Sequence, residues 1–295
     1  MGEALRQLRD EDPQKWRRSE LILTTKLMWG GSGVNEQGLS RKHIQEGMAA
    51  SLKRLQVDYV DLVFCHRADP RTPTESVVRG MSDLIRSGKA MAWGTSQWSA
   101  QQITEAFWIA RTLNLEPPAI EQPQYNMYAR EKMESEFTPL FTSQMYNLGT
   151  TVWSPLAGGL LSGKYNDGIP SDSRLASGDY KAFSDLEEWQ ATGKIQAVRR
   201  LTAFAKNELN CSMPQLAIAW CLKNRNVSTA LLGASKPQQL TENLGAIQVA
   251  RRLTDEHMKA IEHILGNAPE AYLGYGTETL PPASPPDGRR ARPTF

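Results

Sequence analysis

The chain has 295 residues, of which 40% are hydrophobic, 22% charged and 8% aromatic, as in an ordinary soluble globular protein. Its 34 basic and 32 acidic side chains leave a net charge of +2, which argues against a dedicated nucleic-acid-binding protein. No apolar run approaches the roughly 20 residues that a membrane span needs, and the polar N-terminus predicts no signal peptide. Cys65, Cys211 and Cys221 lack metal-ligand spacing, so we expect reduced thiols, a cytoplasmic protein and no metal site.

Six short apolar segments alternate with longer amphipathic segments along the chain. Hydrophobic residues occupy consecutive positions in most of the short segments, which is typical of parallel strands covered on both faces. The spacing between the first five segments suits strand–helix–strand units. The predicted strands are Leu21–Lys26, Tyr59–His66, Met91–Ser96, Ala119–Gln122, Thr150–Pro155 and Ser228–Gly233.

The helical segments between these strands begin at recognisable caps. Ser40 and Ser99 are natural N-caps, and Thr254 precedes a helix over residues 254–265. Residues 3–10 form one further charged helix before the first strand. This alternation predicts an α/β fold with parallel strands, either a barrel or an open sheet.

The strand count and the composition divide the chain into a domain and a tail. A closed (β/α)8 barrel needs eight strands, whereas the sequence shows six candidates. Residues 1–268 are predicted to form one α/β domain, with an inserted loop at about 164–190. Residues 269–295 are rich in Pro and Gly and are predicted to be disordered.

Polar side chains follow the ends of the predicted strands, where parallel α/β folds gather their chemistry. A polar strand end also meets solvent in many proteins, but six such ends favour a site. The other histidines, at 43, 257 and 263, fall in predicted helices and are expected at the surface. The strand-end residues are Lys26, His66 with Arg67, Ser96 with Gln97, Gln122, Ser154 and Ser235.

A glycine-rich segment, Gly158–Lys164, fits the start of a phosphate-binding loop. Tyr165 follows where that motif needs Ser or Thr to hold Mg²⁺, so NTP hydrolysis is not expected. The backbone amides of such a loop could still meet a different phosphate.

Several longer motifs, including LTTKLMWGG, MAWGTSQWS, WSPLAGGLLSGKY and LLGASKPQQLTENLGAI, resemble the aldo-keto reductase superfamily. Within it they are most similar to the potassium-channel β-subunit branch, over about residues 2–267. The resemblance implies a (β/α)8 TIM barrel that binds NADPH and transfers hydride to an aldehyde or ketone. It further implies that residues 1–268 form an incomplete barrel of about six such units, with the first two strands lacking. In this family a Tyr acts as general acid, a Lys–Asp pair lowers the pKa of that Tyr, and a His orients the carbonyl.

By this resemblance Lys26 matches the catalytic Lys and His66 the catalytic His. Ser235 and Gln239, with Lys236 nearby, favour NADP over NAD. The positions matched to cofactor contacts are Ser96, Gln97 and Gln122 for the nicotinamide amide, Trp153, Ser154, Pro155, Leu156 and Ala157 for the ribose and pyrophosphate, Lys164 and Arg174 for the loop over the pyrophosphate, and Gly233, Ser235, Gln239, Glu242 and Asn243 for the 2′-phosphate and adenine.

Two departures from the family pattern bear on function. Gln97 stands where the channel-subunit branch has Arg, and the stretch that would carry the catalytic Asp and Tyr lies upstream of the match to Gly2. Tyr125, three residues past Gln122, is a candidate substitute donor near the pocket mouth.

Three hypotheses follow for the chain. The first is an NADPH-dependent oxidoreductase of aldehydes or ketones whose recorded chain is N-terminally short. The second is a non-catalytic NADPH-binding regulatory subunit that docks on a channel or another partner, and the third is a truncated product without a stable fold. A homo-tetramer is implied by the channel-subunit relatives, with a small carbonyl compound as substrate, no nucleic acid and no membrane insertion.

Overall fold

The computed structural model describes residues 1–173, 175–176 and 186–270. The chain divides into two compact units: Met1–Gln122 with Ser143–Gly149 (unit 1), and Pro123–Thr142 with the chain from Thr150 on (unit 2). The predicted cofactor residue Arg174 and all but two residues of the predicted tail lie outside the described residues, so these expectations stay predictions.

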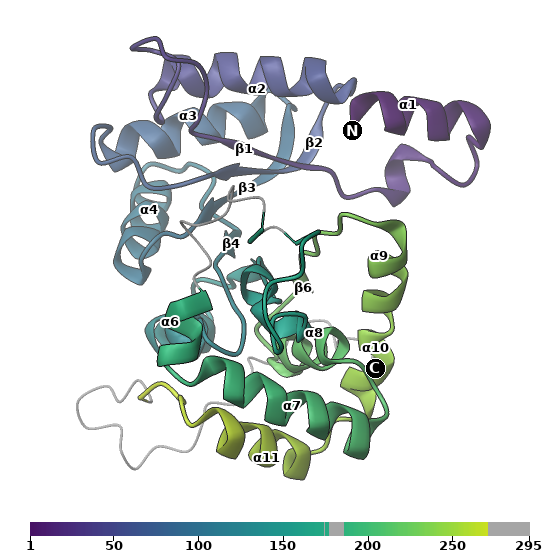
Figure 1. The fold of residues 1–295 in the computed structure, drawn as a ribbon. Helices are drawn as coiled ribbons and strands as arrows, with labels where there is room; N and C mark the ends of the chain where they lie inside the picture. Colours follow the sequence, from purple (N-terminus) through teal and green to yellow (C-terminus); the bar gives the residue numbers. More distant parts are fainter. Residues whose placement is uncertain (174, 177–185, 271–295) are drawn as a thin grey trace. The chain divides into compact units, whose positions relative to one another are not determined.

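Unit 1 contains four parallel strands in sequence order, with a helix after each of the first three (Figure 1). In Figure 1 helices α2 and α3 lie side by side along the strands, and both contact the sheet. The elements of unit 1 are α1 (Gly2–Glu11), η1 (Arg18–Glu20), β1 (Thr24–Leu27), α2 (Arg41–Leu55), β2 (Val60–Cys65), α3 (Thr74–Arg86), β3 (Ala90–Ser96), α4 (Ala100–Thr112) and β4 (Ile120–Gln122).

The strand register sorts the side chains of unit 1 onto two faces. Paired residues share a face, and successive residues alternate between faces. One face, here called the site face, carries Lys26, Phe64, Gly94 and Ile120 at one level and Ser96 with Gln122 at the next level towards the strand ends. The opposite face, here called the covered face, carries the intervening residues, and α2 packs against it.

The covered face forms most of the unit 1 core. Leu27 on this face packs within van der Waals reach of Gly47 in α2. Val63, Cys65 and Trp93 are almost completely buried there. The apolar runs in the sequence therefore reflect strands covered by helices, as predicted.

The predicted helix caps are confirmed. The Ser40 hydroxyl accepts a hydrogen bond from the His43 backbone N–H, and Ser99 forms a capping box with Gln102. Thr254 caps the last helix in the same way. One expectation is wrong: His43 is buried, at 7% exposure, because its ring lies against Gly30, in the loop after β1, and beside Gly47 of its own helix rather than in solvent.

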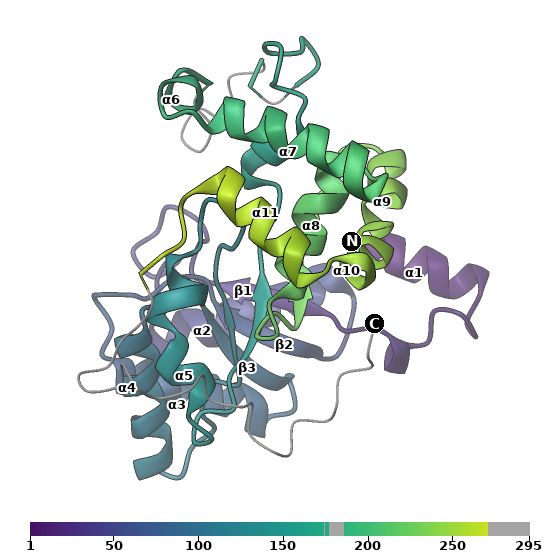
Figure 2. The ribbon, with the colours of Figure 1, turned by 90° about the horizontal axis from the view of Figure 1, so that it is seen from below.

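Unit 2 contains the parallel pair formed by β5 and β6, together with most of the later helices. Helices α7 and α11 lie side by side in both Figure 1 and Figure 2, and α8 packs on α10. The elements in and bordering unit 2 are η2 (Lys132–Glu136), α5 (Thr138–Thr142), β5 (Gly149–Val152), η3 (Ala157–Ser162), α6 (Leu186–Ala191), α7 (Lys194–Leu209), α8 (Met213–Lys223), β6 (Thr229–Ala230), α9 (Pro237–Leu244), α10 (Ala246–Arg252) and α11 (Asp255–Leu265).

A buried ion-pair network fixes the end of unit 2. The Arg130 guanidinium is 7% exposed and donates to Glu134 at 2.7 Å and to Glu262 of α11 at 2.8 Å. Asn267 accepts a further hydrogen bond from Arg130 at 2.9 Å. Because a buried guanidinium needs all its donors satisfied, this network ties the segment after β4 to the C-terminal helix.

All six predicted strands are present among the described residues, each within a few residues of its predicted bounds. Parallel strands that alternate with helices agree with the predicted α/β class and with a partial (β/α)8 barrel. Within the described residues, no helix has the length and apolar character needed to cross a bilayer.

Candidate functional site

Lys26 and His66 occupy the ends of the neighbouring strands β1 and β2. Lys26 lies on the site face in register with Phe64. His66 follows Phe64 by two residues, so the alternation of side chains along the strand directs it to the same face. Both side chains are half-buried, and neither makes a side-chain hydrogen bond or ion pair with any described residue. An amine and an imidazole with uncommitted polar atoms are therefore available to a ligand on this face.

Burial and neighbouring cations shift the titration of both groups. Desolvation, followed by the charges of Lys26 and Arg67, lowers the pKa of His66 to about 4. Desolvation and then Arg67 also lower the pKa of Lys26. His66 is therefore a neutral imidazole at pH 7, which can donate one N–H hydrogen bond to an oxygen without carrying charge.

Ser96 and Gln122 close the same face at the ends of β3 and β4. They pair in register, and the Ser96 hydroxyl donates to the Gln122 backbone carbonyl at 2.9 Å. Both are buried, at 1% and 3% exposure. Their alignment with Lys26 and His66 brings four of the predicted site residues to one edge of one sheet.

Gly94 makes the close approach of these two strands possible. A Cβ at this position would lie 2.3 Å from the carbonyl oxygen of Ile120, its register partner. No side chain fits that space, so glycine is required for steric reasons. The strand ends carrying Ser96 and Gln122 are thus held close together one step further along.

Three predicted cofactor residues have left-handed backbone conformations. Gln97, Ser154 and Ala157 have φ of 62°, 57° and 48°. Of the other four non-glycine residues with positive φ in the described chain, three are Asn, which tolerates this region, and the fourth, Gln56, is the C-cap of α2. For Ala and Ser it costs roughly 1 kcal/mol each, and such strain concentrates where a loop must fit a ligand.

The turn after β5 in unit 2 is held by its own polar groups. The Ser154 hydroxyl accepts from the Gly158 N–H at 3.2 Å, and the Asn126 amide donates to the Ser154 carbonyl at 2.9 Å. Trp153 and Ser154 are half-buried, Pro155 is buried, and Leu156 and Ala157 are half-buried. These two hydrogen bonds fix the conformation of the turn.

Lys164 supplies a cation beside that turn. Its ammonium lies 4.9 Å from the ring of Tyr165, and a Cβ on Gly159 would come within 3.7 Å of its Nζ. Lys164 is exposed and forms no ion pair with a described carboxylate. A free ammonium beside a glycine turn fits a phosphate-bearing ligand.

The segment from Gly233 to Asn243 also belongs to unit 2. The Ser235 amide and hydroxyl contact the Gln239 side-chain oxygen at 3.0 and 3.2 Å, and Lys236 pairs with Asp172 at 3.3 Å. Gly233, Ser235, Gln239 and Glu242 are exposed, whereas Asn243 is buried. The polar groups predicted to meet the 2′-phosphate and adenine are accessible on one short stretch.

Tyr125 is not placed at a pocket mouth. It is 2% exposed, its hydroxyl donates to Glu134 at 2.7 Å, and it accepts from the Asn224 amide at 3.1 Å. Burial and the Glu134 carboxylate raise its pKa far above the ordinary value. A committed, buried phenol cannot serve as proton donor to a substrate, so this alternative is not supported.

Two features of unit 1 were missed from the sequence. Trp29, 61% exposed, lies just past β1 with its ring 6.2 Å from that of His66, edge to face. Trp29 belongs to the LTTKLMWGG motif, but nothing in the sequence indicated that its side chain is exposed. The indole places a large exposed apolar surface beside His66.

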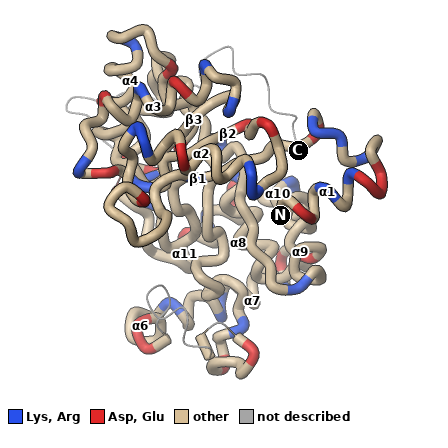
Figure 3. Tube along the Cα trace, turned by 90° about the horizontal axis from the view of Figure 1, so that it is seen from above, with Lys and Arg blue, Asp and Glu red and all other residues tan. Residues whose placement is uncertain are grey.

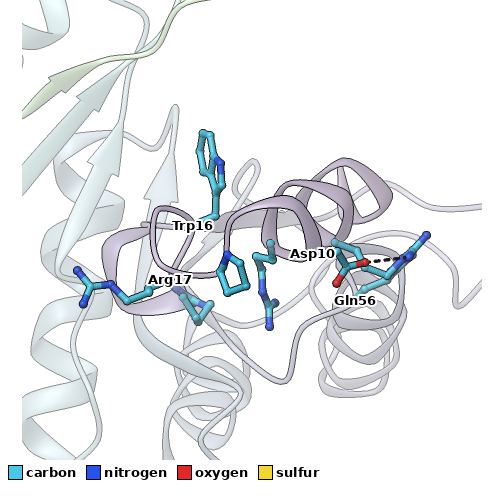
Figure 4. Close-up of a pocket in the computed structure, with 8 residues that line it drawn as sticks. Asp10, Trp16, Arg17 and Gln56 are labelled. Carbon is cyan, nitrogen blue, oxygen red and sulfur yellow. Dashed lines mark hydrogen bonds and ion pairs between the residues drawn. The ribbon is translucent and has the colours of Figure 1, made fainter.

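The second feature is a pocket of about 470 Å³ around α1, shown in Figure 4. Figure 3 shows Lys and Arg alternating with Asp and Glu along this segment. Three of the pocket's arginines already pair with carboxylates, and the fourth, Arg9, has no ion pair among the described residues. The pocket is lined by Arg6, Arg9, Asp10, Pro13, Trp16, Arg17, Arg18 and Gln56.

Comparison with known proteins gives consistent results. The family model described as "Aldo/keto reductase family" matches residues 1–265. A "Probable voltage-gated potassium channel subunit beta" of Oryza sativa subsp. japonica is 49% identical over 276 residues, covering 93% of this chain and 81% of the relative. A protein of the same description from Arabidopsis thaliana is 48% identical over the same shares.

Proposed function

Because the chain belongs to the aldo/keto reductase family, we propose that it binds NADPH and reduces an aldehyde or ketone to the alcohol. When bound, NADPH would supply the hydride that the carbonyl carbon takes up, and the carbonyl oxygen would take one proton from an acidic group or water, giving the alcohol and NADP⁺. The observation that supports this proposal best is the placement of Lys26, His66, Ser96 and Gln122 on one face at adjacent strand ends.

Ser96, Gln97 and Gln122 of unit 1 would contact the nicotinamide amide, which has one donor group and one acceptor. In unit 2 the turn after β5 and Lys164 would contact the pyrophosphate. The 2′-phosphate and adenine would meet the exposed segment around Ser235. The exposed ammonium of Lys164, which forms no ion pair with a described carboxylate, and the hydrogen-bonded turn fit the anionic pyrophosphate.

His66 and Lys26 would act on the carbonyl oxygen. The neutral His66 imidazole donates one hydrogen bond and so orients the carbonyl, while the Lys26 cation stabilises the negative charge that develops on the oxygen. Burial, and after it the charges of Lys26 and Arg67, lowers the pKa of His66 and so favours the neutral imidazole that this role needs. We place this activity in the cytoplasm, where the three thiols stay reduced.

A second function is favoured by the names of the relatives, which are described as channel β subunits. In this reading the chain binds NADPH and regulates a channel partner, as part of a homo-tetramer, without turning over a substrate. The burial of Tyr125 supports it, because that phenol cannot donate a proton.

The test measures NADPH binding by calorimetry and NADPH oxidation by absorbance across a panel of aliphatic and aromatic aldehydes. Reductase function predicts aldehyde-dependent oxidation that falls by at least about a hundredfold in Lys26→Met, since the charge opposite the developing oxyanion is lost, with NADPH affinity retained. Binding without oxidation of NADPH by any aldehyde would contradict the reductase and favour the regulatory subunit. No binding of NADPH would overturn both.

A further inference from the structure

A carboxylate is buried on the covered face of unit 1, directly behind the predicted nicotinamide contacts. Glu121 is 0% exposed and lies in register with Thr95, which is also 0% exposed. The Thr95 hydroxyl donates a hydrogen bond to the Glu121 carboxylate. Cys65, the register partner of Thr95 on β2, is buried on the same face.

Stability alone would not favour a carboxylate at the buried position of Glu121. The rest of the covered face is dominated by apolar side chains such as Leu27, Val63 and Trp93. Taking a carboxylate out of water is costly, and a well-packed apolar residue at such a position often gives a more stable protein. Departures of this kind are expected where function constrains the sequence.

The position of the buried Glu121 carboxylate indicates its role. Thr95 and Glu121 immediately precede Ser96 and Gln122, whose own link lies on the site face. Thr95 and Ser96 of β3 thus each donate a hydrogen bond to β4, Thr95 on the covered face and Ser96 on the site face. A one-residue slip of β3 would break both links and would turn Ser96 away from the site, and a slip of β4 would do the same to Gln122.

We propose that Glu121 is a positioning residue for nicotinamide binding, acting through its hydrogen bond from Thr95 to fix the ends of β3 and β4. The inference rests on the proposed binding of NADPH. Glu121 itself touches neither cofactor nor substrate, because it lies on the opposite face from them. Its removal therefore affects only the end of the cofactor that Ser96 and Gln122 hold.

The experiment compares two ligands by calorimetry on the full chain. NADPH carries the nicotinamide, whereas adenosine 2′,5′-bisphosphate carries only the adenine and 2′-phosphate end. Thr95→Val and Glu121→Leu remove the hydroxyl and the acceptor, and Glu121→Gln retains an acceptor oxygen. Ser82→Ala is the matched control, since it removes another buried hydroxyl of unit 1, one that bonds to the Glu116 backbone.

Thr95→Val and Glu121→Leu are expected to weaken NADPH binding about three- to tenfold, the loss of one hydrogen bond at the site. Their affinity for adenosine 2′,5′-bisphosphate should stay that of the wild type. Glu121→Gln should restore most NADPH affinity, and Ser82→Ala should change neither ligand. If Glu121→Leu does not fold, Thr95→Val carries the test.

Equal weakening of both ligands, or unchanged NADPH binding in Thr95→Val and Glu121→Leu, would overturn the positioning role. Failure of the wild type to bind NADPH would instead overturn the proposed function, and with it this inference. Wild-type binding of NADPH separates these two outcomes.

Discussion

Replacing Gly94 with Ala tests the close approach of β3 and β4. The added Cβ would lie 2.3 Å from the Ile120 carbonyl oxygen and 2.5 Å from its Cγ2, distances that real side chains do not show. Because the first of these atoms is backbone, a strand must move for the methyl group to fit. Overpacking of this kind costs typically about 1–3 kcal/mol.

A second effect partly offsets this cost. Replacing Gly by Ala reduces the conformational entropy of the unfolded chain and stabilises the folded state by about 0.4–1 kcal/mol where Ala fits. The expected net loss for Gly94→Ala is therefore roughly 1–2 kcal/mol. Gly233→Ala is the control, since a Cβ there meets nothing within 4 Å and the backbone is not left-handed.

The assay is urea unfolding followed by circular dichroism, with wild type, Gly94→Ala and Gly233→Ala measured side by side. Gly94→Ala should unfold at lower urea than the wild type, and Gly233→Ala at the same or slightly higher urea. NADPH affinity of Gly94→Ala should also fall, because Ser96 and Gln122 move with their strands. Equal midpoints for the two variants would refute the close approach and the register built on it.

Three further outcomes are expected. The ring resonances of His66 should stay those of neutral imidazole down to about pH 5. The free energy of unfolding should fall as the pH is lowered from the unfolded pKa near 6.5 to the folded value of about 4, because only the unfolded state takes up the proton in this range. Loss of that decline in His66→Gln checks the assignment, and a ring that titrates near pH 6.5 contradicts it. Arg130→Leu should destabilise by about 3 kcal/mol in denaturant unfolding because it leaves the Glu134 carboxylate without its cation, whereas the double change with Glu134→Leu should recover part of the loss. Trp29→Ala should raise KM severalfold for an aromatic aldehyde and leave that of a short aliphatic one nearly unchanged; equal effects on both would remove the indole from substrate binding.

The sequence predicts the fold well where the signal is local. Apolar runs at consecutive positions identify all six strands, and Ser40, Ser99 and Thr254 identify helix starts because each cap satisfies backbone N–H groups within its own first turn. Strand-end polarity then places Lys26 and His66 at one edge. These inferences need only periodicity and the behaviour of parallel strands.

Features that depend on distant partners escape such reasoning. The pairing of Arg130 with Glu262 spans 132 residues, and nothing in the local pattern around either residue indicates it. His43 shows the same limit, because a polar residue in an amphipathic helix was expected at the surface and is buried. The covered position of Glu121 becomes visible only through the strand register.

The chemistry of the described side chains separates what the chain can bind from what it can reduce. Lys26 and His66 can orient and polarise a carbonyl, but His66 is neutral at pH 7 and would lose its orienting N–H if it gave up a proton. Tyr125 is committed to Glu134 and buried. In the proposed reduction, the proton for the product alcohol must therefore come from a group other than His66 and Tyr125, or from water beside Lys26. Since hydride transfer stalls without that proton, while cofactor binding does not need it, binding and turnover can be lost independently, and measuring both decides between a reductase and a regulatory subunit.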